Sequence, residues 1–504
     1  MKFLTWSVFS VLCLLSVNSY AEYSYREGDT RLVNGVLYDS SGDAVTGIYE
    51  EFHDNSQLKS RMPYDGGILH GVGSLYNEQG VKLADMPFVN GKIEGTVMTY
   101  DDNGQLKEKI PYKNGKIQGV KRVFYPNGAV YSRETYFSDV RQGPAKEYYP
   151  DGNLRALYTY SNDIKQGEAK TFFADGSLAE EFAYVNDEIN GDKRVYYHSG
   201  RIKSVIPYVN GQKNGQMRKY HEDGKLEAVV PYKNDSVNGE GRFYDEDGVL
   251  NLSVTYENNV RNGMAQAYYP DGKVQLAVNY KDDIKNGIET DYFENGTIKT
   301  ETPYVDGVVT GVGKEYYENG ELKIKMPYVD AVANGTAQFY DANGNLSAEV
   351  NYKDGMKDGL QIGYNEKGDK ISENNYVQDV LEGEAKTYFD SGKIKSTANY
   401  VEGKLEGLMI IYDEEGNLDF EIPYVKNRRE GIAKHYYPDG KVMNEVTYEK
   451  DKRHGIMVAY NEDETILAKV LFNKDEAIKG YNFDHGQHPK LMSKDELAVY
   501  NSAD

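Results

Sequence analysis

The chain is poor in the residues that hold small disulfide-bonded or metal-bound domains together. Its 504 residues include one cysteine, Cys13, and one tryptophan, Trp6, both within the first 21 positions. The remainder therefore offers no disulfide, no thiolate metal site and no cysteine nucleophile. The most apolar stretch, from Val8 to Val17, is shorter than the roughly 20 residues that a membrane-spanning helix needs.

Catalytic and metal-binding signatures are also missing. There is no phosphate-binding glycine loop, no Gly-x-Ser-x-Gly elbow and no His-Glu-x-x-His motif. Short Asp-x-Asn/Asp-Gly runs lack the later ligands of a calcium loop and are explained as turns; they begin at Asp101, Asp245 and Asp341. Asp484, His485 and His488 could ligate a metal but stand alone in the tail. We predict no enzyme activity, no catalytic residue, no metal and no cofactor.

Positive charge is in deficit. The net charge is −22, and the acidic excess is spread along the chain without an acidic tail. Bulk electrostatics of this sign keep a protein soluble and oppose binding to nucleic-acid phosphates or anionic lipid. We therefore expect no nucleic-acid partner.

Residues 1–21 have the pattern of a secretory signal peptide. Lys2 gives the positive start, Val8 to Val17 the apolar core, and Ser19-Tyr20-Ala21 a small-x-small cleavage site before Glu22. We expect an exported protein that is periplasmic, displayed on the cell surface or secreted.

What the chain does have is a 24-residue repeat without insertion or deletion. Stepping by 24 from Gly47 meets glycine every time to Gly455. The same step from Phe52 to Tyr460 meets only tyrosine or phenylalanine, and we call these residues the first aromatic column. The step from Tyr64 to Phe472 also meets only tyrosine or phenylalanine, and these residues form the second aromatic column. Strict spacing of this kind is typical of a stacked array in which each unit packs against its neighbours.

Each repeat has the signals of a β-hairpin with two specified turns. In residues 145–160, β-forming residues flank Pro150-Asp151-Gly152, and a type I turn there would pair Tyr148 with Leu154. The same pairing is expected for Tyr268 with Val274 and for Tyr316 with Leu322. Three residues after each second-column aromatic stands Gly, Asp or Asn, except at Ala331, so this position requires a left-handed backbone.

The run Tyr148-Tyr149-Pro150-Asp151-Gly152-Asn153-Leu154 resembles the MORN repeat, and the longer spacing with Pro-Tyr resembles the bacterial MORN variant family that includes YwqK-type antitoxin proteins. The resemblance covers about residues 47–472 in 18 units. It implies an all-β fold, an elongated twisted antiparallel β-ribbon of tandem hairpins. It further implies protein binding, membrane association or scaffolding, without catalysis.

Four segments follow from this organisation. We expect a signal peptide at 1–21, an N-terminal capping segment at 22–46 with a strand over Leu32–Tyr38, the repeat array at 47–472 and a C-terminal capping tail at 473–504. In the tail, Ser493-Lys494-Asp495-Glu496 has the form of a capping box that opens a short helix.

Period-2 alternation places both aromatic columns on one face of the ribbon, and the other face is mostly solvated. A basic column two residues before the first aromatic column is expected on the aromatic face, where cations and tyrosines could bind a carboxylate or a phosphate. Alternatively, each cation pairs with an acid two positions earlier on the same face, such as Glu168, Asp192, Glu240 or Glu384. The candidate binding face comprises Arg122, Lys146, Tyr148, Lys170, Phe172, Arg194, Tyr196, Arg218, Tyr220, Arg242, Tyr244, Tyr268, Lys314, Tyr316, Lys386, Tyr388, Lys434 and Tyr436.

An apolar strip that a single-layer sheet cannot cover usually marks an interface. The sequence therefore predicts an exported scaffold that binds a protein partner, or a second copy of itself, through its aromatic face. An envelope lipid or glycan binder, and an antitoxin or immunity protein that neutralises a toxin, are the alternative interpretations.

Overall fold

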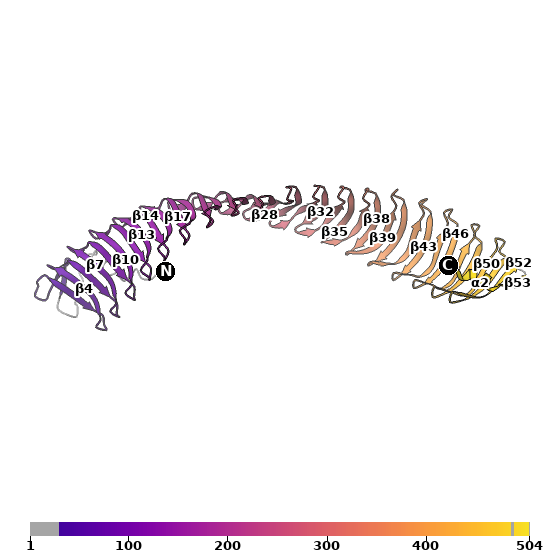
Figure 1. Ribbon diagram of the computed structural model, residues 1–504, viewed down its shortest axis with the longest axis horizontal. Helices are drawn as coiled ribbons and strands as arrows, with labels where there is room; N and C mark the ends of the chain where they lie inside the picture. The colour runs from indigo at the N-terminus through magenta and orange to yellow at the C-terminus, as the bar shows by residue number, and fades with distance from the viewer. Residues whose placement is uncertain (1–29, 485–487, 503–504) are drawn as a thin grey trace. The chain divides into compact units, whose positions relative to one another are not determined.

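The computed structural model describes residues 30–484 and 488–502, so the expected signal peptide, Cys13 and Trp6 lie outside the described residues. Within the described part, the chain is built of strands with one helix, α2 (Lys494–Ser502). It divides into unit 1, residues 1–248, and unit 2, residues 249–504. In each unit the strands lie side by side in chain order (Figure 1). The predicted all-β fold of tandem antiparallel hairpins is confirmed.

One repeat shows how the hairpin forms. Strand β14 (Val140–Tyr148) pairs with β15 (Leu154–Ser161), and Tyr148 faces Leu154 as predicted. Gly152 closes the turn with a φ of 93°, and its N–H donates to the Tyr149 carbonyl at 2.9 Å. The predicted pairs of Tyr268 with Val274 and of Tyr316 with Leu322 are confirmed as well.

The second turn is tighter than the sequence suggested. Ser161 pairs with Ile164 of β16 (Ile164–Lys165), which leaves a two-residue loop of Asn162 and Asp163. Both loop residues are left-handed, with φ of 52° and 67°, as a type I′ hairpin turn requires. The predicted left-handed position is confirmed, and a second one precedes it. Even Ala331 adopts this conformation, with a φ of 65°.

Successive hairpins join edge to edge. Strand β15 also pairs with β17 (Gly167–Phe172) of the next repeat, so Leu157 lies between Lys146 and Lys170. The same elements recur at 24-residue steps, from β3 (Gly47–Phe52) and β4 (Leu58–Asp65) to β50 (Lys452–Tyr460) and β51 (Ile466–Asn473).

A β-bulge in every repeat decides which side chains share a face. Tyr148 faces Leu154 but Glu147 faces Ala156, so Arg155 has no partner across the strand. An extra residue shifts the alternation by one, so Tyr148 and Tyr160 point to opposite sides of the sheet. The prediction that both aromatic columns share one face is wrong. It assumed that side chains alternate without interruption along the hairpin, whereas the bulge residue shifts this alternation by one.

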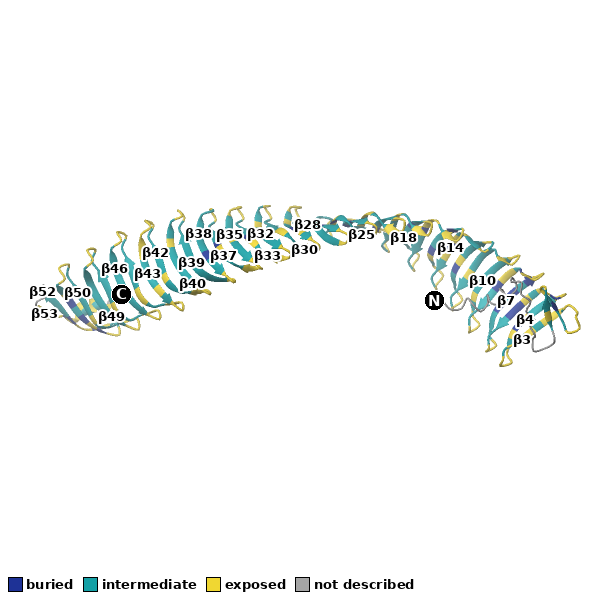
Figure 2. Ribbon diagram, turned by 180° about the vertical axis from the view of Figure 1, so that it is seen from behind, coloured by how far each residue is buried: buried dark blue, intermediate teal, exposed yellow. Residues whose placement is uncertain are grey.

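We name the two sides by the positions of the repeat at 143–166. The packed face carries the positions of Ala145, Ala156, Tyr158 and Tyr160. The open face carries those of Lys146, Tyr148, Leu157 and Thr159. Nearly all buried hydrophobic residues of the repeats belong to the packed face, including Phe88, Val97, Ala169, Phe182, Val230, Val278, Ala337, Val350 and Phe472. Most other strand residues are only half-buried (Figure 2), as expected of a single layer.

Further strands flank the array at both ends, and a helix follows them at the C-terminal end. At the N-terminal end, the expected single strand is a hairpin of β1 (Arg31–Val33) and β2 (Val36–Tyr38), and the Leu37 N–H donates to the Gly67 carbonyl at 2.7 Å. At the C-terminal end, β52 (Glu476–Asp484) and β53 (His488–Leu491) extend the sheet.

The predicted capping box at the C-terminal end is confirmed. The Ser493 N–H donates to the Glu496 carboxylate at 2.6 Å, and the Glu496 N–H donates to the Ser493 hydroxyl at 3.2 Å. Helix α2 then places Leu497 and Tyr500 against the cluster around Phe472 on the packed face. The last hairpin is thereby covered where no further repeat follows.

The repeated glycine at the start of each hairpin supports a testable prediction. Gly215 has a φ of +121°, and an added Cβ would lie 2.9 Å from Pro207 Cγ of the preceding strand. Gly191 holds the same position with a φ of +93° and open space around it. A positive φ costs an alanine about 1 kcal/mol at either site, but only Gly215→Ala adds a clash.

We therefore expect Gly215→Ala to accelerate hydrogen exchange in residues 202–220 more than Gly191→Ala accelerates it in residues 178–196. The difference should be on the order of tenfold, measured by mass spectrometry. Equal exchange in the two variants would show that the contact with Pro207 does not matter.

Candidate binding face

The candidate residues of the basic and first aromatic columns share the open face. Across the strands, the Lys146 positions alternate with the Leu157 positions and form a central row along this face. What fills the Leu157 position therefore decides whether each cation has a neighbouring acid.

Six of the nine candidate cations have carboxylate partners. Lys170 and Arg194 both contact Glu181, at 3.2 and 3.9 Å. The remaining pairs are Arg242 with Glu240, Lys314 with Glu301, Lys386 with Glu384 and Lys434 with Glu445. Pairing with the acid two positions earlier is thus confirmed for Arg242 and Lys386, whereas Lys170 and Arg194 use an acid on the neighbouring strand.

The other three candidate cations are Arg122, Lys146 and Arg218, and all three are exposed. Within residues 30–484 and 488–502 their side chains make no ion pair or hydrogen bond. Arg218 lies between Val205 and Val229, and Lys146 between Arg133 and Leu157. The open face of unit 1 is therefore locally more basic than the net charge of the chain suggests.

In unit 2 a glutamate occupies the Leu157 position in five of ten repeats. It accepts a hydrogen bond from the aromatic-column tyrosine 15 residues later, as in Glu301 with Tyr316 at 2.9 Å and Glu373 with Tyr388 at 2.7 Å. Glu349, Glu421 and Glu445 bind Tyr364, Tyr436 and Tyr460 in the same way. Sequence analysis missed this ladder, although a Glu–Tyr spacing of 15 residues could have found it.

These contacts hold the tyrosines in the neutral form. Burial, followed by the hydrogen bond to Glu373, raises the pKa of Tyr388 to about 12. Burial and the same type of contact also raise the pKa of Tyr316 and of Tyr436. The hydrogen bond from Lys370, and then that from Tyr388, lowers the pKa of the Glu373 carboxyl. The charged and tyrosyl groups of this face in unit 2 thus largely satisfy one another.

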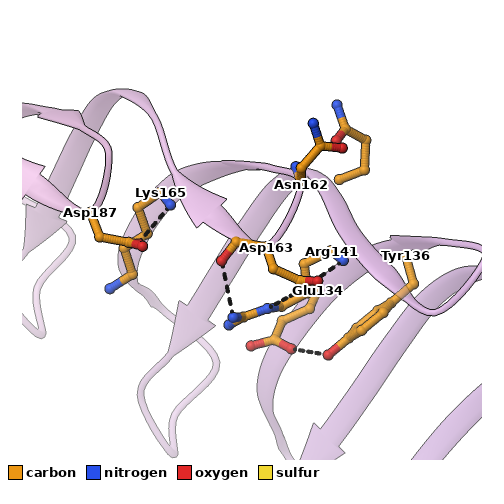
Figure 3. A network of polar contacts seen from close by, with 8 residues as sticks. Glu134, Tyr136, Arg141, Asn162, Asp163, Lys165 and Asp187 are labelled. Carbon is orange, nitrogen blue, oxygen red and sulfur yellow. Dashed lines mark hydrogen bonds and ion pairs between the residues drawn. The ribbon is translucent and has the colours of Figure 1, made fainter.

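A second set of cations, on the packed face, clamps neighbouring repeats together. The Arg141 backbone N–H and Nε both donate to Asp163 Oδ1 at 3.0 Å (Figure 3). The Asp163 N–H also donates to the Arg141 carbonyl at 3.0 Å. The Arg141 backbone N–H, and then its side chain, lower the pKa of the Asp163 carboxyl. The left-handed Asp of the second turn thus also binds the preceding repeat.

The same arginine covers an aromatic ring. The Arg141 guanidinium lies 4.0 Å from the ring centroid of Tyr160. Equivalent cations cover second-column rings in other repeats: Lys165 with Tyr184, Lys213 with Tyr232, Arg261 with Tyr280, Lys285 with Tyr304, Lys357 with Tyr376, Arg429 with Tyr448 and Arg453 with Phe472. These cations are structural, and sequence analysis had not singled them out.

The open face of unit 2 also carries exposed apolar side chains, which we call the apolar strip. One column of the strip holds the position of Pro144 and is 40–56% exposed: Met264, Ile288, Val312, Leu360, Leu408, Ile432 and Ile456. Across from it stand prolines, as in Ile288 with Pro303 and Val312 with Pro327. A second column flanks the type I′ turns: Val305, Val308, Val329, Val332, Val377 and Val380.

The described residues offer open hollows but no cluster of metal-ligating side chains. Unit 2 holds two open hollows of about 410 and 310 Å³, the first beside Asn262 and Asn279 and the second beside Gly313 and Tyr328. Among the residues that the structure describes, no three His, Cys, Asp or Glu side chains converge. Asp101 Oδ1 accepts the N–H groups of Asn103 and Gln105, as a turn-starting aspartate does.

The remaining metal candidate falls partly outside the structure. Asp484 pairs with His488 across the last hairpin, and His485 lies outside the described residues. In the described ranges, no helix has both the length and the apolar character needed to cross a membrane.

The repeats match the profile of a known family. The sequence profile of the MORN repeat variant matches thirteen segments that together cover more than half of the chain: 45–65, 93–114, 141–162, 165–186, 213–234, 237–258, 261–282, 285–306, 309–330, 333–354, 381–402, 405–426 and 429–450. The chain belongs to the MORN repeat variant family. Each matched segment contains the hairpin described above and ends at, or just before, the first residue of the type I′ turn.

Other comparisons add no function to these MORN repeats. No curated protein matches the chain. Among solved structures, that of TcdB2-TccC3-Cdc42 aligns at 11% identity over 87% of this chain, and that of TcdB2-TccC3 at 12% over 88%, each with a TM-score of 0.14. The chain spans 28% and 27% of the length of those chains. Likeness this low supports no argument about fold or activity.

The tyrosine–glutamate ladder predicts a response to alkali. An unfolded tyrosine ionises near pH 10, whereas the folded pKa of Tyr388 is about 12. A raised pKa stabilises the fold fully below about pH 10, and this stabilisation is lost as the pH rises through the folded value. We expect tyrosinate absorbance at 295 nm to rise later in the native protein than in the urea-unfolded chain.

Glutamine in place of Glu301, Glu373 and Glu421 should lower the pKa of Tyr316, Tyr388 and Tyr436 part of the way towards the ordinary value, because burial, the largest cause of the raised pKa, remains. Identical titration curves for this variant and the native protein would contradict the role of the ladder.

Proposed function

We propose that this MORN-repeat protein is a non-enzymatic scaffold that binds another protein through its open face. The observation that carries the proposal is the apolar strip of unit 2. Its side chains are 40–56% exposed, although they are as large as core residues. Exposed apolar surface that continues over many repeats is typical of protein interfaces.

The composition of this face supports a protein partner. Apolar residues at the Pro144 position and aromatic residues at the Tyr148 position form two parallel columns along the array, and the charges of the central row between them are largely paired. Such a mixture of apolar contacts, tyrosines and satisfied polar groups resembles the core of protein interfaces. An anionic lipid or a phosphorylated or sulfated glycan would instead require free cations, and the candidate cations of unit 2 all contact glutamates.

The apolar strip can be tested by exchange for threonine. Thr336 and Glu384 occupy the same position in their own repeats, so a polar residue there is compatible with the fold. We expect Ile288→Thr, Val312→Thr and Ile432→Thr together to lower partner affinity more than about tenfold, because each covered side chain contributes about 1 kcal/mol or more. The measurement is affinity capture by the tagged full chain, followed by mass spectrometry and a binding titration with the captured protein.

The matched control replaces Val89, Val185 and Val209 of unit 1 with threonine. These valines are 42–47% exposed, which is similar to the residues of the apolar strip. A discrete protein should be retained by the control variant, and its binding should persist in high salt. Capture of only lipid or polysaccharide would contradict the proposal, as would equal loss in both variants. Recovery of the chain alone, with a dimer on size-exclusion chromatography, would replace the partner with a second copy.

Export is a further proposal, and it rests on the pattern of residues 1–21. We expect the mature chain in envelope or medium fractions to begin at Glu22, with a net charge of −23 because the peptide removes one lysine and no acid. Intact mass measurement after cell fractionation tests this, and a chain with Met1 in the cytoplasm would contradict it. Antitoxin activity of the YwqK type rests on the family resemblance alone.

A further inference from the structure

Four cations stand next to one another on the open face of unit 1. Lys109 of β10 (Leu106–Lys113) faces Arg122 of β12 (Gly119–Phe124), which faces Arg133 of β13 (Val130–Phe137), which faces Lys146 of β14. Direct cross-strand neighbours of like charge destabilise a sheet. A row of four in a chain of net charge −22 therefore needs an explanation.

The acids beside these cations in the sequence point away from them. Glu108, Glu134 and Glu147 immediately neighbour Lys109, Arg133 and Lys146, and the pleat sends them to the packed face. There they contact other groups: Glu108 binds Lys121 at 3.1 Å, Glu134 accepts from Tyr136, and Glu147 binds Arg155 at 2.9 Å. The acids that would neutralise the row are therefore engaged on the other side of the sheet.

The rows on either side of the four cations also lack acids. Towards the second turns lie the pairs Thr96–Pro111, Val120–Thr135 and Pro144–Thr159, and towards the first turns lie Tyr100–Leu106, Phe124–Val130 and Tyr148–Leu154. Within residues 30–484 and 488–502, none of the four cations has an ion pair. Other parts of the central row differ, because Glu181, Glu301 or Glu373 interrupts them.

Two of the four cations are held in place by rings. The Lys109 ammonium lies 5.9 Å from the centroid of Phe124, and the Arg133 guanidinium lies 5.3 Å from that of Tyr148. Cation–π contacts restrain these side chains without neutralising them. A ligand that meets the row thus loses less side-chain entropy than it would on free surface lysines.

We propose that the row of Lys109, Arg122, Arg133 and Lys146 binds an acidic, extended segment of the protein partner. The inference rests on the proposed protein-binding function and specifies the chemistry of the partner. Strands about 4.8 Å apart make the row about 14 Å long. Three carboxylates on alternate residues of an extended chain span about 13 Å, so they match the row in length as well as in charge.

The overall charge favours a short acidic segment over a larger polyanion. A peptide of a few residues meets mainly the cations within one screening length, about 8 Å at physiological salt. An anionic membrane or a nucleic acid would also face the surrounding acidic surface, which repels it. The row is therefore selective for a small, strongly acidic element presented by a protein.

The test uses the full chain and a fluorescein-labelled peptide, Glu-Thr-Glu-Thr-Glu-Thr-Glu, with a control peptide that has glutamine for glutamate. Fluorescence anisotropy should show saturable binding of the acidic peptide at low salt and at least tenfold weaker binding of the glutamine peptide. Arg122→Gln, Arg133→Gln and Lys146→Gln together should weaken binding of the acidic peptide at least tenfold. Circular dichroism reports whether the variant folds.

The matched control is Lys107→Gln, Arg155→Gln and Lys203→Gln, which changes the net charge equally at the bulge position. Arg155 there contacts Glu147 of the packed face. This variant should bind within about twofold of the native protein. Equal weakening in both variants would overturn the proposal in favour of non-specific attraction. Row-dependent binding of vesicles containing 20% phosphatidylserine, with no binding of the peptide, would overturn it in favour of a lipid.

The peptide and the captured partner separate the two proposals. Failure of the peptide to bind, with the apolar-strip variant still losing its partner, would overturn only the acidic-segment inference. Failure of the chain to capture any protein would overturn the scaffold function itself.

Discussion

The architecture depends on the β-bulge that follows the first turn of every repeat. Because Arg155 is inserted opposite the step from Glu147 to Tyr148, the strand changes the side to which its even-numbered residues point. The first aromatic column is thereby directed to the open face and the second to the packed face. Without the bulge, both columns and the aliphatic positions would crowd one side of a single layer, and the other side would have almost nothing to pack.

The residues that stabilise the array and those proposed to bind a partner lie on different faces. The packed face holds the small core, the cations that cover tyrosine rings and the Arg141–Asp163 type of clamp between repeats. Few side chains of the open face are buried, so the residues on this face can vary along the array while the backbone repeats. In unit 1 it presents a row of cations, and in unit 2 a tyrosine–glutamate ladder beside the apolar strip. A repeated scaffold can therefore carry locally different surfaces.

Local chemistry made the hairpins predictable. Gly152 and its equivalents indicate the first turn, and the Gly, Asn and Asp residues after the second aromatic column indicate the second turn. Ser493 and Glu496 indicate the start of the final helix. Each of these signals acts within a few residues, where steric limits on φ and ψ dominate. The bulge left no such signal, because the extra residue is Arg155 in one repeat and Lys107 or Lys203 in others. The face assignment therefore failed, although the candidate cations and tyrosines before the bulge do share a face.

The sequence by itself determined the repeat length, the positions of both turns, the strand pairing within each hairpin and membership of the MORN repeat variant family. Tertiary structure decided which residues face each other between strands. Lys109, Arg122, Arg133 and Lys146 become one row only through the registers of neighbouring hairpins. Glu108, Glu134 and Glu147 do not neutralise that row, because the pleat directs their side chains to the packed face, where they contact other groups. The physical reason is that turns depend on neighbours in the chain, whereas a charged surface depends on side chains that strand pairing brings together from different repeats.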